Sequence, residues 1–380
     1  MNQNYNINLK DSKLKKIIYI LDNFPKISET FILNEICHLI DLGLDINIIS
    51  LNDPQEQSIN EQYVKYNLKT KTLYCKVEEL TELNNKLIKA IEGAQLIHAH
   101  FAHNAALAAA RVASTLKLPF TVTIHAYEIF RKDCFDKNRV QNTCDLANLI
   151  FTPSLYNKKF IQDIINVNPE KIKVVRATID HHRFKNTHIN VDDRKNYKLI
   201  YCGRLVDKKG IEYLIQAVSQ LRNSRGDFFL KILGHGPLET SLKSLTDELN
   251  ANSFITFLGE QTNEVFLKEL KNSDVFISPC IISDNGDRDV CPLTIQEAMA
   301  MTVPVITTNI ASIPELIENQ VSGILVKQKS SEELKNAIDN LLNNREERVK
   351  LVLNARKKIE EEFNNTLQTN RLLTFWNELL

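Results

Sequence analysis

Short apolar runs recur along the first half of this chain, separated by longer segments of mixed polarity. Seven of these runs predict strands, at residues 16–21, 45–50, 72–75, 95–100, 119–125, 148–152 and 173–176. Runs of this length without strict alternation are typical of strands buried on both faces. Apolar residues at helical spacing, or richness in alanine, predict helices at residues 31–40, 82–91 and 104–116. This half therefore predicts an α/β domain.

A second alternation of the same kind follows in the second half of the chain. Its predicted strands are residues 198–202, 228–233, 255–258, 275–278, 303–307 and 324–326. Helices are predicted at 210–221 and 237–249, from about Leu293 onward, and across 331–343 and 345–379. Two successive alternations predict an α/β fold of two doubly wound, Rossmann-like domains that face each other across a cleft, with helices at the C-terminus.

The polar stretch at residues 185–197 contains almost nothing apolar and is predicted to link the two domains. We therefore predict four parts: a polar N-terminal arm, an N-terminal domain, a C-terminal domain, and a final helix that packs back on the N-terminal domain. Their expected bounds are residues 1–14, 15–190, 191–360 and 361–380.

Composition narrows the class of protein. The 380 residues carry 47 basic and 47 acidic side chains, so nothing in the overall charge indicates a nucleic-acid partner. The seven cysteines form no C-x-x-C pair, and no apolar run reaches the ~18–20 residues of a membrane span. The polar first residues also lack a signal-peptide core. These features predict a cytoplasmic protein, and they leave peripheral contact with the membrane open.

The stretch from Asp289 to Glu297 carries the strongest chemical signal. If a helix begins near Leu293, the N–H groups of Leu293 and Thr294 lack helical partners and, with the helix dipole behind them, suit a phosphate group. The two carboxylates could accept hydrogen bonds from sugar hydroxyls on either side. A solvated helix residue at Glu297 and an ordinary loop acid at Asp289 remain the alternative interpretation.

Two further loops suit a diphosphate. After the first strand of the second domain, Gly203 lets the backbone turn, while Arg204 offers a bidentate fork and Lys209 a point charge. A solvent-facing basic loop would look the same. After the next strand, Gly234 and Gly236 precede Pro237 and could let the backbone approach a ligand, although a lone G-x-G is weak evidence.

Taken together, these pieces resemble the family 4 glycosyltransferases, retaining enzymes with the two-domain GT-B fold. The matching segments occur in the family's order at residues 203–210, 234–237, 257–259, 274–279, 289–300 and 313–317. In the first domain, residues 24–31, 98–101 and 123–130 look like the subgroup that builds exopolysaccharides and related surface glycans.

The resemblance implies roles for the matching positions. Arg204 and Lys209 would neutralise the donor diphosphate, Glu297 would hold the ribose, and Asp289 and His125 would face the transferred sugar. Gly203, Gly234, Gly236, Pro237, Gly259, Leu293 and Thr294 would complete the donor site, and the acceptor would enter over Phe24, Ser28, Glu29 and Thr30. The expected co-substrate is a UDP- or GDP-sugar and the acceptor a glycan or lipid-linked glycan, with no metal or other cofactor required.

Some positions depart from the family pattern. Asp289 stands where glutamate is usual and is one methylene shorter, and Val290 replaces the glycine that usually follows. These departures motivate a non-catalytic sugar-nucleotide-binding or accessory protein as one alternative, and a GT-B sugar-nucleotide epimerase is a second. The sequence also leaves open whether Asp289 forms a covalent intermediate.

Two other groups of residues could carry chemistry. His98, His100 and His103 could suggest a metal site, but no acid or cysteine lies near them in sequence to complete a ligand set, so a metal site is not favoured. Cys202 and Cys280 lie at the ends of apolar strands, where core packing is favoured over a nucleophilic role.

Overall fold

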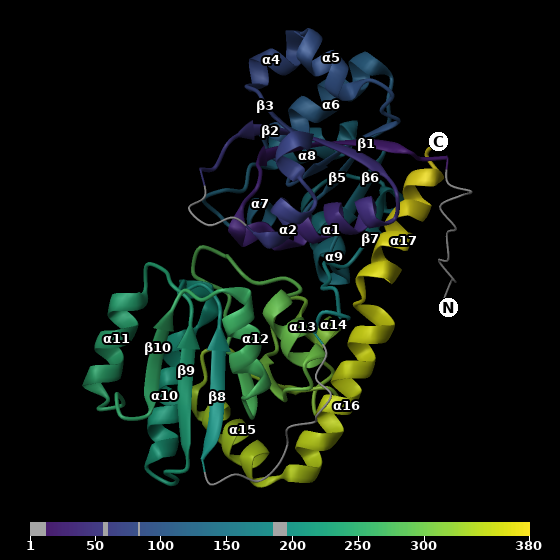
Figure 1. Ribbon diagram of the computed structural model, residues 1–380. Coiled ribbons are helices and arrows are strands. Elements are labelled where there is room, and N and C mark those ends of the chain that lie inside the picture. The colour runs from purple at the N-terminus through teal and green to yellow at the C-terminus, as the bar shows by residue number, and fades with distance from the viewer. Residues whose placement is uncertain (1–12, 56–59, 83, 185–195) are drawn as a thin grey trace. The chain divides into compact units, whose positions relative to one another are not determined.

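The computed structural model describes residues 13–55, 60–82, 84–184 and 196–380, and these divide into two compact units (Figure 1). The N-terminal unit is Met1–Thr178 together with Asn365–Leu380, and the C-terminal unit is Ile179–Asn364. Residues 1–12 of the predicted arm and residues 185–195 of the predicted linker lie outside the described residues.

The N-terminal unit is built on a parallel sheet of seven strands in the order β3-β2-β1-β4-β5-β6-β7. The strands are β1 (Lys16–Asn23), β2 (Asp45–Asn52), β3 (Thr72–Tyr74), β4 (Leu96–His100), β5 (Phe120–Thr123), β6 (Leu149–Thr152) and β7 (Ile172–Val174). The strand order reverses between β1 and β4, as it does in doubly wound folds.

Helices accompany this sheet, and the last helix of the chain is one of them. They are α1 (Thr30–Asp41), α2 (Glu61–Lys65), α3 (Leu68–Lys71), α4 (Val77–Glu82), α5 (Asn85–Ile91), α6 (Asn104–Leu116), α7 (Tyr127–Phe130), α8 (Lys137–Leu146), α9 (Leu155–Ile164) and α17 (Asn365–Asn377). Ile17 and Tyr19 of β1 share one core with residues of α1 and α17. Within it, the buried indole of Trp376 donates to the Thr121 hydroxyl at 3.1 Å.

The C-terminal unit has a parallel six-stranded sheet in the order β10-β9-β8-β11-β12-β13. Its strands are β8 (Tyr197–Cys202), β9 (Phe228–Leu233), β10 (Ile255–Gly259), β11 (Val275–Ser278), β12 (Val305–Thr308) and β13 (Ile324–Val326). The helices are α10 (Ile211–Arg222), α11 (Glu239–Glu248), α12 (Asn263–Lys271), α13 (Leu293–Ala300), α14 (Ile313–Leu316), α15 (Ser331–Asn343) and α16 (Arg345–Glu362).

Successive residues of the central strand β8 enter different cores of this unit. Leu199 and Tyr201 pack with residues of α10 and α15, whereas Ile200 packs with residues of α12 and α13. Each face of the sheet is thus covered by helices, which explains why the strands read as continuous apolar runs.

Three features differ from the sequence-based expectation. The helix predicted at 82–91 corresponds to α5, which begins only at Asn85 because the Asn84 side chain accepts hydrogen bonds from Lys86 N–H and Leu87 N–H; Glu82 is instead the last residue of a separate helix, α4. The units also change at Thr178 and Ile179 instead of at 190, since Ile179 pairs with Asn364 and packs in the C-terminal unit. The short helices α2 and α3 were not predicted.

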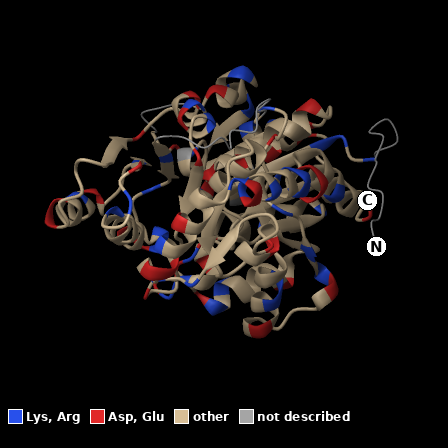
Figure 2. Ribbon diagram, turned by 90° about the horizontal axis from the view of Figure 1, so that it is seen from below, with Lys and Arg blue, Asp and Glu red and all other residues tan. Residues whose placement is uncertain are grey.

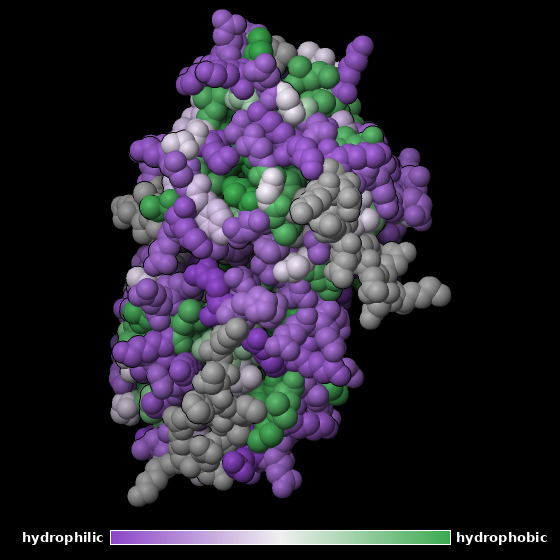
Figure 3. All heavy atoms as spheres, turned by 45° about the vertical axis from the view of Figure 1, so that its right-hand side comes forward, coloured by the Kyte–Doolittle hydropathy of each residue, from purple (hydrophilic) through white to green (hydrophobic). Residues whose placement is uncertain are grey.

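The surface agrees with the neutral composition. Acidic and basic residues are interspersed along the ribbon in Figure 2, and the face drawn in Figure 3 is mostly hydrophilic, with hydrophobic residues in small separate patches. Among the described residues, no helix combines the length and apolar character that crossing a bilayer requires.

Candidate active site

The predicted donor residues gather at the carboxyl edge of the C-terminal sheet. Strand β8 lies between β9 and β11, so the strand order reverses beside it, and the loops that follow β8 and β11 meet at this edge. Open α/β sheets bind their ligands at such a switch point. The loop after β8 carries Arg204 and Lys209, and the loop after β11 carries Asp289.

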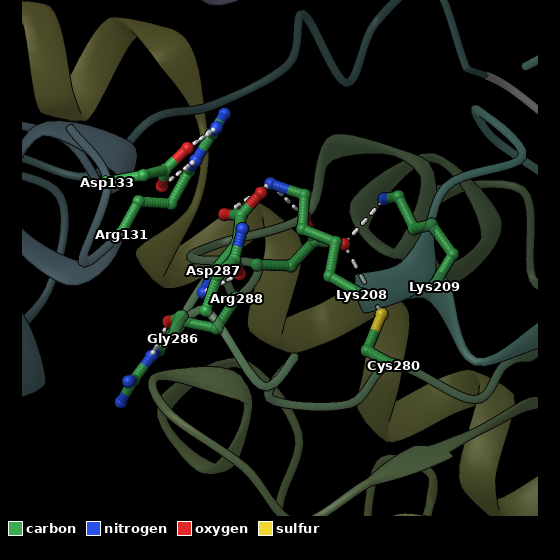
Figure 4. Close-up of polar contacts among 10 residues, drawn as sticks. Arg131, Asp133, Lys208, Lys209, Cys280, Gly286, Asp287 and Arg288 are labelled. Carbon is green, nitrogen blue, oxygen red and sulfur yellow. Dashed lines mark hydrogen bonds and ion pairs between the residues drawn. The ribbon is translucent and has the colours of Figure 1, made fainter. Parts of the chain in front are cut away.

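Asp289 is buried and lies at the centre of an ionic cluster. Figure 4 labels the other members, Lys208, Lys209, Cys280 and Asp287. The Oδ2 atom of Asp289 is 2.5 Å from Lys209 Nζ and accepts from the Cys280 thiol at 3.3 Å, while its Oδ1 atom is 3.4 Å from Lys208 Nζ. Lys208 Nζ is also 3.1 Å from Asp287 Oδ1. Lys209 and Asp289 were predicted as site residues, whereas Lys208 was not, because its sequence signal is only that it adjoins Lys209.

The electrostatics of this cluster favour full ionisation. Burial opposes charge on both partners, but the attraction between them is larger. The two lysines and the Cys280 thiol therefore hold the pKa of Asp289 well below its usual range. Likewise, burial lowers and Asp289 raises the pKa of Lys209, with a net increase. Asp289 is thus a carboxylate whose two oxygens are already engaged.

Arg204 supplies an exposed cation beside this cluster. Its guanidinium has no hydrogen bond or ion pair within the described residues, and it is close enough to Lys209 to lower that lysine's pKa. The Arg204 backbone is fixed, because its carbonyl oxygen accepts from the Tyr201 hydroxyl at 3.2 Å. An arginine whose backbone is anchored and whose guanidinium is unpaired can bind a phosphate group with little rearrangement.

Helix α13 begins at Leu293, as predicted. Its first backbone bond runs from Gln296 N–H to the Pro292 carbonyl, and Pro292 offers no side-chain cap. Among the described residues, the N–H groups of Leu293, Thr294 and Ile295 therefore have no partner. They can receive an anion at the positive end of the helix.

Glu297 projects from the second turn of the same helix and is partly exposed. Burial raises its pKa to about 7, and Arg183 opposes that shift. No hydrogen bond satisfies its carboxyl group among the described residues. Glu297 and Lys209 both act on the pKa of Cys202, which indicates that the helix and the ionic cluster border the same space.

The two glycine-rich loops pack on each other. A Cβ atom at Gly234, where φ is +136°, would lie 1.9 Å from the Gly203 carbonyl oxygen, and one at Gly236 would lie 2.5 Å from that of Leu205. Leu205 N–H also donates to the His235 carbonyl at 3.0 Å. The close approach predicted toward a ligand is therefore an approach between neighbouring loops, which holds Arg204 in place.

The remaining two predicted donor positions lie on neighbouring parts of the same edge. Gly259 ends β10, and its carbonyl accepts from Gly234 N–H at 2.8 Å. Pro237 is exposed and lies just before α11.

In the N-terminal unit, His125 lies two residues beyond β5 and is buried. Its Nε2 atom is 2.9 Å from His100 Nδ1, and His100 Nε2 is 3.1 Å from Glu35 Oε1. Burial, with a further contribution from His100, lowers the pKa of His125, so its ring is neutral near pH 7. A pocket of this unit is lined by residues that include Asn34, Glu35, His100, Thr123, His125 and Gln368.

Two of the three histidines considered for a metal site, His98 and His100, are hydrogen-bonded through their rings. His98 and His100 do converge with Glu35 within 4.8 Å, but His98 bonds to Thr121 and Thr123. The ring of His103 stacks on that of Tyr127 and is not in this group. Because each nitrogen of His98 and His100 already has a protein partner, a metal would have to break these bonds.

The predicted acceptor-side residues have different environments. Phe24 was predicted to contact the acceptor, but its side chain is buried in the core and packs near Tyr63, so an acceptor cannot reach it. Ser28 is exposed within a 3-10 turn, Ile27–Glu29, and Thr30 begins α1. Glu29 forms an ion pair with Lys26 at 2.6 Å.

Both cysteines at the strand ends suit packing more than nucleophilic chemistry. Burial raises the pKa of Cys202 and of Cys280 to about 12, which disfavours the reactive thiolate.

Comparison with known families gives two consecutive matches. A model described as "Glycosyltransferase Family 4" matches residues 28–183, and one described as "Glycosyl transferases group 1" matches residues 183–358. Together they span both units of the chain.

Full-length relatives and structures agree with these matches. The amylovoran biosynthesis glycosyltransferase AmsK of Erwinia amylovora is 26% identical, covering 94% of this chain and 98% of its own. The putative colanic acid biosynthesis glycosyltransferase WcaL of Escherichia coli is also 26% identical, covering 96% and 100%. The structure of Anabaena Alr3699/HepE with UDP has a TM-score of 0.79 at 17% identity, covering 96% and 100%. The complex of the same protein with UDP-glucose gives 0.74 at 18%, with the same coverage. The fold is therefore GT-B.

Proposed function

The chain belongs to the family 4 glycosyltransferases, and we propose that it transfers a sugar from a uridine diphosphate sugar to a hydroxyl of a glycan or lipid-linked glycan, with retention at the anomeric carbon. Relatives named for amylovoran and colanic acid biosynthesis support a surface polysaccharide as the product. The fold neighbour bound to UDP and to UDP-glucose supports uridine as the donor base. Such a reaction would take place in the cytoplasm or at the inner face of its membrane.

The observation that carries this proposal is the convergence of positive charge on one loop edge. Within the described residues Arg204 is unpaired, Lys208 and Lys209 follow it in the same loop, and the N–H groups at the start of α13 that lack partners add the positive end of a helix dipole. A leaving diphosphate gains negative charge in the transition state. Preorganised donors and cations stabilise this charge at little cost of rearrangement.

The same arrangement supports transfer without a metal ion. Where other transferases use a divalent cation to neutralise the diphosphate, Arg204, Lys209 and the start of α13 would do so here. Glu297 would accept hydrogen bonds from the ribose hydroxyls, because its carboxyl group lies at the same edge without a hydrogen-bonding partner in the described chain.

The environment of Asp289 bears on the mechanism. A nucleophilic carboxylate needs a free oxygen, whereas both oxygens of Asp289 contact lysines and one also accepts from Cys280. This favours a same-face reaction, in which the leaving phosphate assists deprotonation of the acceptor hydroxyl, over a covalent intermediate at Asp289. Asp289 would then act by holding Lys208 and Lys209 toward the phosphates.

The test begins with binding and turnover of a panel of UDP- and GDP-sugars, with and without EDTA. We expect UDP binding and UDP release that do not change with EDTA. Arg204→Ala should weaken UDP binding about 10- to 100-fold, the effect of one charge-assisted hydrogen bond. Lys350→Ala removes an exposed lysine of α16 in the same unit and should leave binding unchanged.

Three results would contradict parts of this proposal. Turnover that disappears with EDTA would refute metal independence, and preference for GDP-sugars would refute the uridine assignment. A product of inverted anomeric configuration in the NMR spectrum would refute retention.

A further inference from the structure

A chain of hydrogen bonds connects the interior of the N-terminal unit to its pocket. The buried Tyr19 hydroxyl donates to Glu35 Oε1 at 2.8 Å, and the same oxygen is 3.1 Å from His100 Nε2. His100 Nδ1 is 2.9 Å from His125 Nε2. Glu35, His100 and His125 all line the pocket, and the side chain of Glu35 is 20% exposed.

For a neutral His100, the acidic end sets the direction of these bonds. An ionised carboxylate only accepts hydrogen bonds, so the hydrogen between Glu35 and His100 belongs to His100 Nε2. A neutral imidazole carries a single N–H, which makes His100 Nδ1 an acceptor. His125 must then donate from Nε2, and its Nδ1 atom is left without a hydrogen.

Other contacts hold the His125 ring in one place. Its backbone N–H donates to Glu128 Oε1 at 2.6 Å, and its carbonyl accepts from the Asn157 amide. The rings of Phe31 and Phe101 flank it at 4.5 and 4.7 Å between centroids. Nδ1 has no hydrogen bond among the described residues, so the tautomer alone decides whether this atom accepts or donates.

We propose that Glu35 is a positioning residue which, through a neutral His100, holds His125 as the Nε2–H tautomer and so keeps Nδ1 as an acceptor for a ligand hydroxyl. His98 does not compete for this role, because its ring nitrogens bond to Thr121 and Thr123. The consequence for sugar binding rests on the proposed function, whereas the tautomer itself does not.

The decisive measurement is the tautomer of His125 in the full chain, from two-bond ¹⁵N–¹H NMR correlations of histidine-labelled protein. The signals are assigned by their loss in His125→Asn. Glu35→Met keeps the side-chain volume but removes the acceptor, and Glu35→Gln keeps an acceptor oxygen. Tyr19→Phe removes the other bond to the same oxygen and keeps the aromatic ring that packs against His98 and His100.

The wild type, Glu35→Gln and Tyr19→Phe should show the Nε2–H form, and Glu35→Met should show the Nδ1–H form in substantial amount. A wild type in the Nδ1–H form, or a Glu35→Met spectrum identical to that of the wild type, would overturn the proposal. Thermal unfolding of each variant confirms that the fold is intact.

The effect on transfer is measured separately. Glu35→Met should raise KM for the sugar donor about 3- to 10-fold, the range of one neutral hydrogen bond, and Glu35→Gln should restore it. A changed tautomer with an unchanged KM would support the positioning role of Glu35 and refute the contact between His125 and the sugar. The two inferences can therefore fail independently.

Discussion

Replacing Asp289 by asparagine would leave Lys209 as a largely buried cation without its partner. The substitution conserves shape, so its cost comes from charge and not from a cavity. Lys208 keeps Asp287, but Lys209 has no second acidic partner in the described chain. Removing one member of a buried ion pair costs about 3–5 kcal/mol. Because 14% of the Lys209 side chain is exposed and can turn toward water, we expect a loss of about 2–4 kcal/mol.

Asp287→Asn is the matched control in the same cluster. Its carboxylate is more exposed, at 19%, and contacts Lys208, which retains Asp289 as a partner at 3.4 Å. Its loss should cost about 0.2–1 kcal/mol, as is usual for accessible ion pairs. The difference in unfolding free energy between the two variants therefore measures the cost of leaving the buried charge of Lys209 unpaired, apart from the cost of removing a carboxylate.

The assay is urea unfolding followed by far-UV circular dichroism and by tryptophan fluorescence. Trp376 is the only tryptophan and lies in the N-terminal unit, so a transition seen only by circular dichroism belongs to the C-terminal unit. The Asp289→Asn effect should appear in that transition. A loss below about 1 kcal/mol, or one no larger than that of Asp287→Asn, would refute the reasoning.

The cost of Asp289→Asn should also depend on pH. The cluster lowers the pKa of Asp289 in the folded protein, so its contribution is fully present above the unfolded value of about 4. It is lost as pH falls below that value, toward the folded pKa. The gap in stability between the wild type and Asp289→Asn should therefore be constant from pH 5 to 7 and shrink in more acidic solution.

Two further predictions concern single residues of the C-terminal unit. Burial raises the pKa of Glu297 to about 7, so the wild type should lose stability as pH rises from the usual glutamate range to about 7. Glu297→Gln should make the melting temperature depend less steeply on pH. An unchanged pH dependence would contradict the raised pKa of Glu297. Burial also raises the pKa of Glu128 to about 7, so Glu128 should account for the pH dependence that remains in Glu297→Gln. Gly234→Ala should lower the free energy of unfolding in urea by more than about 3 kcal/mol, because its Cβ would meet the Gly203 carbonyl. Gly259 also has a positive φ but open space around it, so Gly259→Ala should cost about 1 kcal/mol. Equal costs would contradict the packing of the two glycine-rich loops.

Strand positions were predictable from sequence because both sheets are covered on both faces. Residues 16–21 and 228–233 are apolar nearly throughout, and each corresponds to an observed strand, β1 and β9. The region from 52 to 94 was not predictable in the same way. Its helices are short, and where α4 ends and α5 begins depends on the side chain of Asn84, which has no counterpart in an apolar pattern.

Residue type alone could not separate ligand approach from internal packing. Gly234 and Gly236 have the form of a ligand loop, yet the space beside their Cα atoms is filled by the backbone of the preceding loop. Phe24 lies in a motif segment at the carboxyl edge, yet its side chain is in the core. In both cases the deciding fact is a neighbour from a distant part of the chain, which periodicity and spacing do not reveal.

The two candidate sites nevertheless follow one rule that can be read from sequence. In each sheet the order reverses beside the first strand, so the ends of β1 and β4, and of β8 and β11, have space between them. Sequence reasoning could therefore place His100 and Arg204 at such edges from the apolar runs that precede them. It could not find Glu35 or Lys208, because each is defined by the side chain it meets, 65 residues away at His100 and 79 at Asp287. A polar residue within a helix or loop becomes part of a site only through that contact. The hydrogen-bond chain from Glu35 to His125 and the lysine cluster could therefore be found only from the structure.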